Sequence, residues 1–166
     1  MAGPPLTAVH RIAVLGGRDF PIRQGSAWVL QGVTSYERYV QPAERSALVA
    51  RQPLLGRAEA TCAGLIPIRK SDAWWELTQV ERRAIFEERS RHIAIGLEYL
   101  PAIARRLYHS RDLGQFFDFL TWFEYAPASR ELFEELVGKL RETEEWDYVE
   151  REVDVRLTLR RRRLRH

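Results

Sequence analysis

In the central and C-terminal parts of the chain, apolar and polar residues follow regular patterns that predict four strands. Residues 61–69 form a mostly apolar run, which is typical of a buried strand. Residues 103–110 and 117–125 are two further candidate strands, and the glycine-containing segment 111–114 between them predicts a turn. The run 153–159 alternates apolar with polar residues, which indicates a last strand.

Two helices are expected between these strands. Thr78 and Glu81 have the spacing of a capping box, which predicts a helix that starts there and runs to about Arg91. Ser129 is the candidate N-cap of a second helix, whose apolar residues recur at helical spacing. Those apolar residues are Leu132, Phe133, Leu136, Val137 and Leu140.

The resulting order of elements is strand, helix, strand, strand, helix, strand. This is the order of a ferredoxin-like βαββαβ core, in which an antiparallel sheet carries both helices on one face. We therefore expect an α+β fold with this core over residues 60–160. The other face of the sheet needs cover, which a partner subunit, N-terminal strands or a cofactor could provide.

Residues 1–59 are expected to form extra N-terminal strands and a connecting segment. The run His10–Gly16 indicates one short strand, residues 27–40 indicate one or two more, and residues 42–52 indicate a short helix. Residues 161–166 form a basic tail at the other end. The whole chain is thus expected to be a single structural domain.

Composition limits the classes of protein that this chain can represent. Its 166 residues, 45% hydrophobic and 30% charged, are typical of one soluble globular domain. The single cysteine, Cys62, excludes an intrachain disulfide and a cysteine-based zinc cluster. The chain has no signal-like start or membrane-spanning run, so a cytoplasmic location is the default expectation. Net charge is +3, with much of the excess in the tail, and we expect neither nucleic acid nor a membrane as a partner.

Arg105 and His92 are the residues whose settings indicate chemistry. Alternation places Arg105 on the strand face of Ile103 and Leu107, where a guanidinium is costly unless an anion pairs with it. That anion could be a ligand, a substrate or a protein carboxylate such as Glu124. His92 lies between a polar helical run and an apolar segment, where a neutral imidazole could ligate a metal. A surface or helix-end role is the more common one for such a histidine, and His109, on the Arg105 face, is a competing ligand.

Three segments resemble the chlorite dismutase family, which consists of haem proteins with a ferredoxin-like α/β-barrel core. LIPIRKSDAWW (65–75) resembles the family's strand that ends in a basic pair followed by two tryptophans. IARRLYHS (103–110) resembles its strand with the distal arginine, and DFLTWFE (118–124) resembles the strand after it. The resemblance covers residues 60–150, and the short chain is similar to the family's dimeric branch.

The resemblance implies a haem b cofactor and a role for each matching residue. His92 matches the proximal iron ligand, and Arg105 matches the catalytic distal arginine. The residues that match the lining of the haem edge and its propionates are Lys70, Trp74 and Trp75. A glutamate of the family hydrogen-bonds the proximal histidine; among the candidates Glu142, Glu144 and Glu145, counting from the preceding helix favours Glu145.

The resemblance also implies an enzyme that converts chlorite to chloride and dioxygen, and a homodimer. One alternative is a haem-binding or peroxidase-like member with a different substrate. Coproheme decarboxylases of the superfamily carry glutamine where this chain has Arg105, which argues against that activity. Another alternative is a dimeric ferredoxin-like module without haem, which a pairing of Arg105 with Glu124 would favour. The segment between Arg82 and His92 is longer by about one helical turn than in the best-known members.

Overall fold

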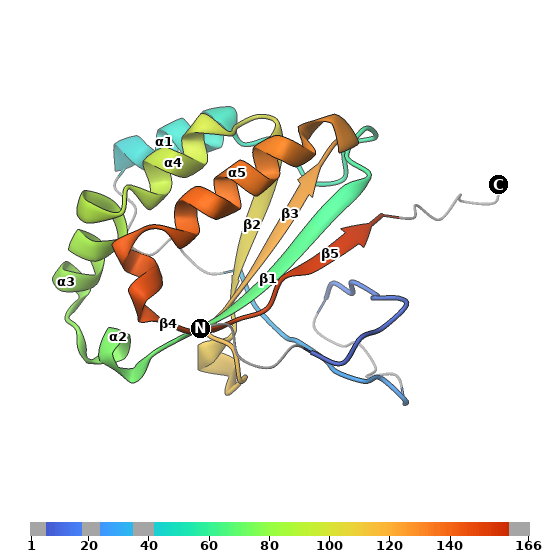
Figure 1. The fold of residues 1–166 in the computed structure, drawn as a ribbon, viewed down its shortest axis with the longest axis horizontal. Helices are drawn as coiled ribbons and strands as arrows, with labels where there is room; N and C mark the ends of the chain where they lie inside the picture. The colour runs from blue at the N-terminus through green and yellow to red at the C-terminus, as the bar shows by residue number, and fades with distance from the viewer. Residues whose placement is uncertain (1–5, 18–23, 35–41, 160–166) are drawn as a thin grey trace.

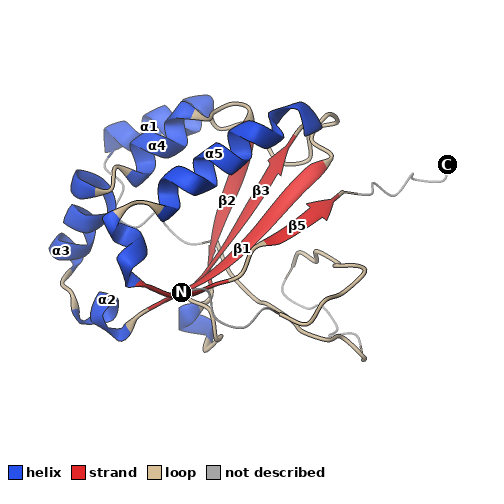
Figure 2. Ribbon diagram, in the orientation of Figure 1, coloured by secondary structure: helices blue, strands red, loops and turns tan. Residues whose placement is uncertain are grey.

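The computed structural model describes residues 6–17, 24–34 and 42–159, and its centre is an antiparallel sheet (Figures 1 and 2). The strands lie in the order β2-β3-β1-β4, and β5 also pairs with β1. This α+β arrangement confirms the ferredoxin-like order expected from the sequence. The strands are β1 (Cys62–Lys70), β2 (Ile103–His109), β3 (Phe119–Tyr125), β4 (Val149–Glu152) and β5 (Val155–Thr158).

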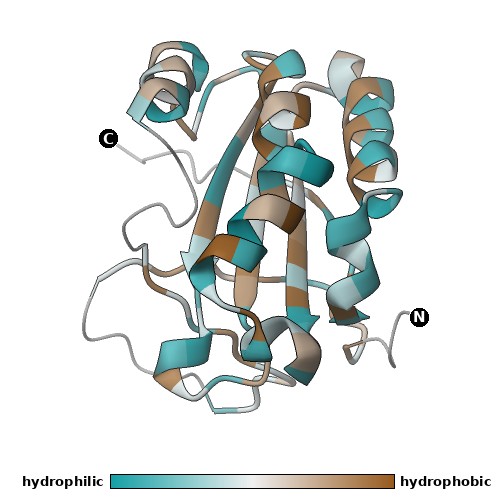
Figure 3. Ribbon diagram, turned by 90° about the vertical axis from the view of Figure 1, so that its left-hand side faces the viewer, coloured by the Kyte–Doolittle hydropathy of each residue, from teal (hydrophilic) through white to brown (hydrophobic). Residues whose placement is uncertain are grey.

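The longer helices cover one face of the sheet, side by side, with α4 between α1 and α5 (Figure 3). The α-helices are α1 (Pro42–Arg51), α2 (Asp72–Glu76), α3 (Gln79–Arg83), α4 (His92–Glu98) and α5 (Arg130–Arg141). A π-helix, η1 (Ala84–Arg89), joins α3 to α4, and the 3-10 helix η4 (Glu144–Tyr148) follows α5. None of the helices in the described ranges has both the length and the apolar character needed to cross a membrane.

Phe133 is the centre of the core between the sheet and α5. Its side chain is fully buried, and its ring stacks on Tyr125 at a centroid distance of 4.4 Å and lies 5.1 Å from Phe123. A Cβ added to Gly64 of β1 would lie 2.8 Å from Phe133 Cζ. The ring therefore packs directly on the strand backbone at a position that only glycine leaves open.

The N-terminal chain packs against the opposite face of the sheet (Figure 1). Leu6 and Leu30 pack on a small core there that contains Leu120, and a Cβ at Gly32 would meet Tyr108 Cβ at 2.7 Å. This contact provides cover for that face, but not in the form of strands. In the described residues, the backbone of this chain pairs with the sheet through one isolated bridge, from Val33 to His109.

The strands predicted near the N-terminus are accordingly wrong within the described residues. His10–Gly16 forms no strand, and residues 27–34 contribute one isolated bridge, from Val33 to His109. Residues 35–40 of the second prediction and the tail at 161–166 lie outside the described residues. The short helix predicted at 42–52 is confirmed as α1, which Glu44 ties to Arg83 of α3 at 2.6 Å.

The helix predicted from Thr78 to Arg91 starts as expected but does not continue as one α-helix. The capping box is present: Thr78 Oγ1 accepts from Glu81 N at 3.3 Å, and Glu81 Oε2 accepts from Thr78 N at 2.7 Å. The chain then widens into η1, and Arg91 adopts a left-handed conformation with φ 52°. That residue ends the run and starts α4, a helix that was not predicted.

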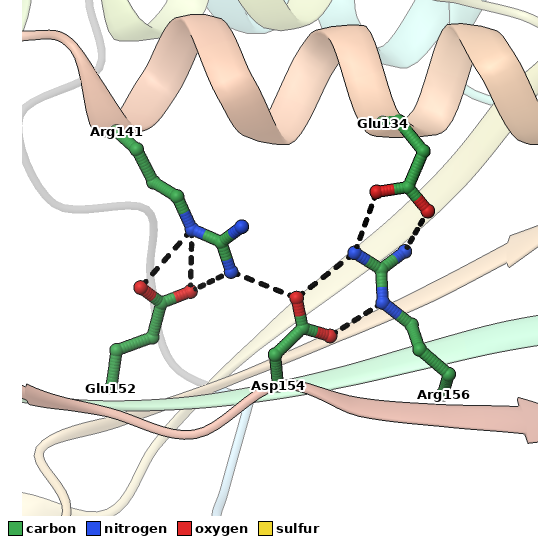
Figure 4. A network of polar contacts seen from close by, with 5 residues as sticks. All are labelled: Glu134, Arg141, Glu152, Asp154 and Arg156. Atoms are coloured by element: carbon green, nitrogen blue, oxygen red, sulfur yellow. Dashed lines mark hydrogen bonds and ion pairs between the residues drawn. The ribbon is translucent and has the colours of Figure 1, made fainter. Parts of the chain in front are cut away.

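The last predicted strand is present as the two short pieces β4 and β5, and its alternation is correct. Val153, between them, donates its N–H to Pro67 O at 3.0 Å, and its side chain packs on the far face. Asp154 and Arg156 point the other way, toward α5 (Figure 4). There Arg141 binds Asp154 at 2.8 Å and Arg156 binds Glu134 at 2.9 Å, so ion pairs fasten the edge of the sheet to the helix.

Replacement of Phe133 by alanine should reduce the free energy of unfolding by about 3–5 kcal/mol, because it leaves a cavity between α5 and the sheet. Urea denaturation monitored by circular dichroism measures this. Leu132→Ala is the matched control, since the neighbouring Leu132 is 42% exposed and its truncation should cost about 1 kcal/mol or less. Equal losses for the two variants would contradict this view of the core.

Candidate functional site

A chain of three charged or ionisable side chains joins β1, η4 and α4. His92 is the first residue of α4, and its Nδ1 lies 2.6 Å from Glu145 Oε2. The other carboxylate oxygen of Glu145 accepts from Lys70 Nζ at 2.8 Å, and Lys70 also donates to the backbone oxygen of Glu145 at 3.1 Å. Of the three candidate glutamates, Glu145 is therefore the one in contact with His92.

Glu145 and Lys70 are buried charges, with exposed fractions of 5% and 3%. Burial opposes ionisation of Glu145, but the charges of His92 and Lys70 outweigh it and lower the pKa of the carboxyl to about 2. Burial lowers the pKa of Lys70, which Glu145 partly offsets. Although Lys70 is the last residue of β1, it is buried and paired with Glu145.

The Glu145 carboxylate determines which nitrogen of His92 is available. An ionised carboxylate accepts the Nδ1 proton, so the lone pair of a neutral ring lies on Nε2. Within the described ranges, Nε2 has no hydrogen-bond partner, and the His92 side chain is 20% exposed. The ring is thus oriented as a metal-binding histidine is, by a carboxylate behind it.

Three residues that the sequence patterns did not single out support this pair from η1 and the turn after it. The Phe86 ring stacks on His92 at 4.4 Å. Glu87 accepts from the backbone N–H of Ile93 at 2.6 Å, and Ser90 Oγ accepts from Glu145 N at 2.9 Å. The extra length between Arg82 and His92 was the one sequence signal that pointed to this segment.

Arg105 approaches the same region from the sheet. It pairs with Phe123 in the β2–β3 ladder and so faces the helices, where its guanidinium packs on Gly96: a Cβ there would lie 2.6 Å from Nη1. Burial lowers its pKa, and the carboxylates of Glu87 and Glu145 partly oppose that effect. The described residues provide the guanidinium with no hydrogen-bond acceptor, so it is suited to an anionic ligand.

Glu124 is excluded as the partner of Arg105. It pairs with Ala104 in the β2–β3 ladder and therefore faces the opposite side of the sheet. Its carboxylate there accepts from Gly56 N at 2.5 Å and from Trp122 Nε1 at 2.9 Å. The pairing that would have favoured a module without haem is absent from the described residues.

The two tryptophans differ in their surroundings. Trp74 is 1% exposed and covers the ammonium of Lys70, which lies 4.4 Å from its ring centroid. Trp75 stacks on Phe119, with the guanidinium of Arg111 3.9 Å from its ring. Its buried indole N–H has no partner in the part of the chain that the structure describes. A donor of this kind beside a cation is suited to a ligand carboxylate.

His109 lies at the end of β2 with its ring edge-on to Phe119 at 5.4 Å. It is buried, and its backbone pairs with Val33. His92 is the histidine that the structure places on Glu145, so the geometry favours His92 over His109 as a metal ligand.

Comparison with known proteins agrees with this geometry. The family model described as chlorite dismutase matches residues 22–161, which is most of the chain. The chain belongs to the chlorite dismutase family. The dimeric chlorite dismutase of Nitrobacter winogradskyi is 65% identical, with a TM-score of 0.79 over 83% of this chain and 81% of that one.

More distant chlorite dismutases match a smaller share of their own length. The structure from Candidatus Nitrospira defluvii in complex with imidazole is 31% identical, with a TM-score of 0.62 over 74% of this chain and 49% of that one. The chlorite dismutase of Ideonella dechloratans is 37% identical over 76 residues, which are 42% of this chain and 25% of that protein. This chain thus matches about half or less of the length of these two relatives.

Removal of the buried ammonium should destabilise the site because it leaves the Glu145 carboxylate with less compensation. We expect Lys70→Met to lower the free energy of unfolding of the apoprotein by about 3 kcal/mol, measured by urea denaturation. Arg69→Met is the control: Arg69 pairs at 3.0 Å with a Glu150 that is 55% exposed, and such a pair contributes about 1 kcal/mol or less. A cost for Lys70→Met no larger than that of the control would contradict the role of Lys70.

Proposed function

We propose that this protein is a haem b-dependent chlorite dismutase that converts chlorite to chloride and dioxygen. The observation that carries the proposal is the pair formed by His92 and an ionised, buried Glu145, on the side of the sheet where the guanidinium of Arg105 lies without an acceptor. Membership of the chlorite dismutase family supports the same activity.

The residues present fit a haem group in three respects. His92 offers Nε2 to an iron while Glu145 holds Nδ1. Trp75 has a buried N–H without a partner beside the Arg111 cation, an arrangement suited to a propionate. Leu107 lies on the helix-facing side of β2 and yet is 45% exposed, which leaves apolar sheet surface for a flat ligand.

Lys70 and Trp74 would support the site from behind. The Lys70 ammonium is engaged with Glu145 and covered by the Trp74 ring. In this arrangement both residues act on the cofactor through the position and charge of Glu145. Of the three residues matched to the haem edge, Trp75 is the one whose indole N–H is available for direct contact with a propionate.

In the proposed mechanism the protein controls charge and orientation. Glu145 fixes the tautomer of His92 and increases the basicity of Nε2, which strengthens binding to iron. Bound haem supplies the oxygen-transfer chemistry. Arg105 attracts chlorite, which is an anion, and holds it in the site. The local dielectric constant is low there, so a fixed positive charge has a larger effect than in water.

We also propose that the chain forms a homodimer. Support comes from the Nitrobacter winogradskyi protein, which is described as dimeric and resembles this chain over most of both lengths.

Titration of the purified apoprotein with haem b should give a saturable Soret shift in the visible absorption spectrum. His92→Ala should abolish that shift or weaken haem affinity by roughly 100-fold, because it removes the iron ligand. His10→Ala is a control at an exposed histidine, and His109→Ala tests the competing ligand. Absence of a shift in the wild type, or loss of it in His109→Ala alone, would contradict the assignment.

Arg105→Ala should leave haem affinity within about twofold of the wild type and lower kcat/KM for chlorite by roughly 10- to 100-fold. The number of chlorite molecules consumed before inactivation should fall as well. An oxygen electrode measures both quantities. The control is Arg106→Ala, since Arg106 is exposed and points to the opposite face of β2. Similar rates and lifetimes in the two variants would rule out this role for Arg105.

A further inference from the structure

The segment between α3 and His92 does not continue as an α-helix. The π-helix η1 spans Ala84–Arg89, and Arg91 follows with φ 52°. π-helices are rare, and a left-handed residue with a long side chain is strained, so both persist only where other contacts compensate for their cost. The contacts made by this segment therefore indicate its role.

Glu87 makes the contact nearest to His92. Helix α4 begins without a side-chain cap, since its N-cap residue, Arg91, contributes none. Instead, the Glu87 carboxylate accepts the N–H of Ile93 at 2.6 Å and that of Ala94 at 3.3 Å. These are two of the N–H groups that a helix start leaves without acceptors, so Glu87 caps α4 from the preceding helix.

The same carboxylate also influences the sheet side of the site. Its charge acts on the guanidinium of Arg105, a residue of intermediate exposure. That guanidinium lies against Gly96, one turn after His92 on α4. Glu87 therefore supports the start of the helix that carries His92 and partly offsets the cost of burying the Arg105 charge.

We propose that Glu87 is a positioning residue for His92: its carboxylate fixes the start of α4 and with it the direction in which Nε2 points. Phe86 stacks on the His92 ring and Ser90 Oγ accepts from the Glu145 backbone, whereas Glu87 accepts two backbone N–H groups of α4. That the orientation serves iron binding rests on the proposed function. That Glu87 holds the start of α4 rests on its contacts within the chain alone. The segment between Arg82 and His92 is thus part of the site.

The first test uses the apoprotein and needs no haem. Hydrogen exchange of the Ile93 and Ala94 amides should be roughly tenfold faster in Glu87→Ala than in Glu88→Ala, a control at the exposed neighbour in the same π-helix. Glu87→Gln, which keeps a carbonyl acceptor, should exchange at a rate between the two. Equal exchange in Glu87→Ala and Glu88→Ala overturns the proposal. If Glu87→Ala does not fold, the comparison of Glu87→Gln with Glu88→Ala decides in the same way.

The second test measures the orientation of the ligand. In the ferrous haem complex, Glu87→Ala should shift or broaden the iron–histidine stretching band in resonance Raman spectra and release haem roughly tenfold faster. Ile66→Val, a mild truncation in the core of β1, controls for general loss of stability. Glu87→Gln should restore the band in part.

The outcomes separate the positioning role of Glu87 from the proposed haem-dependent function. Faster amide exchange with a wild-type band and release rate would make Glu87 a helix cap alone, and would overturn the positioning role. If the wild type binds no haem, the proposed function fails; the exchange test then still decides whether Glu87 fixes the start of α4.

Discussion

The buried carboxylate of Glu145 is the constraint on which the rest of the site depends. A charge with an exposed fraction of 5% is stable only if opposite charges and hydrogen-bond donors surround it. Lys70 from the end of β1 and His92 from the start of α4 meet that requirement at the two carboxylate oxygens. Ser90, from the turn before α4, accepts from the backbone N–H of Glu145 and so holds the residue itself in place.

The ferredoxin-like fold makes this convergence possible. The end of β1 and the segment after α5 meet beside β4, because β4 pairs with the last residues of β1. The α4 helix lies beside α5 on the same face, so His92 reaches the segment that contains Glu145. Arg105 comes from the edge strand β2, beneath α4. The guanidinium therefore approaches from the sheet, whereas the His92 imidazole comes from the helix layer above it.

Much of this arrangement could be predicted from local pattern. Alternation in β2 correctly grouped Arg105 with Ile103 and Leu107 on one face, and the spacing of Thr78 and Glu81 correctly started α3. Family resemblance, together with counting along the chain, pointed to Glu145. Pattern could not reveal η1 or the helix after it, because no glycine or proline between 84 and 91 marks the break. Arg91 is left-handed against its intrinsic propensity, and its backbone bonds to Glu87 on one side and Ile95 on the other.

The irregular cover of the far face was missed for a similar reason. Residues 10–16 were predicted as a strand, but most of this run is exposed, with Val14 at 70% and Leu15 at 49%, and it forms no ladder. In the second predicted segment, Gly32 packs closely on Tyr108, and the described residues pair with the sheet through a single bridge, from Val33 to His109. The N-terminal chain was one of the covers that the sequence left open for this face, and the described residues provide it without strands.

The two outer strands of the sheet limit how copies of this chain can associate. One edge of the sheet is formed by β4 and β5, is broken between them and carries charged side chains. The other edge is β2, where the Gln52 side chain hydrogen-bonds the backbone oxygen of Arg105 and Val33 pairs with the backbone of His109. Broken or occupied edges discourage strand addition. A continuous sheet running through two subunits is therefore disfavoured, and side-chain surfaces are the expected means of subunit contact.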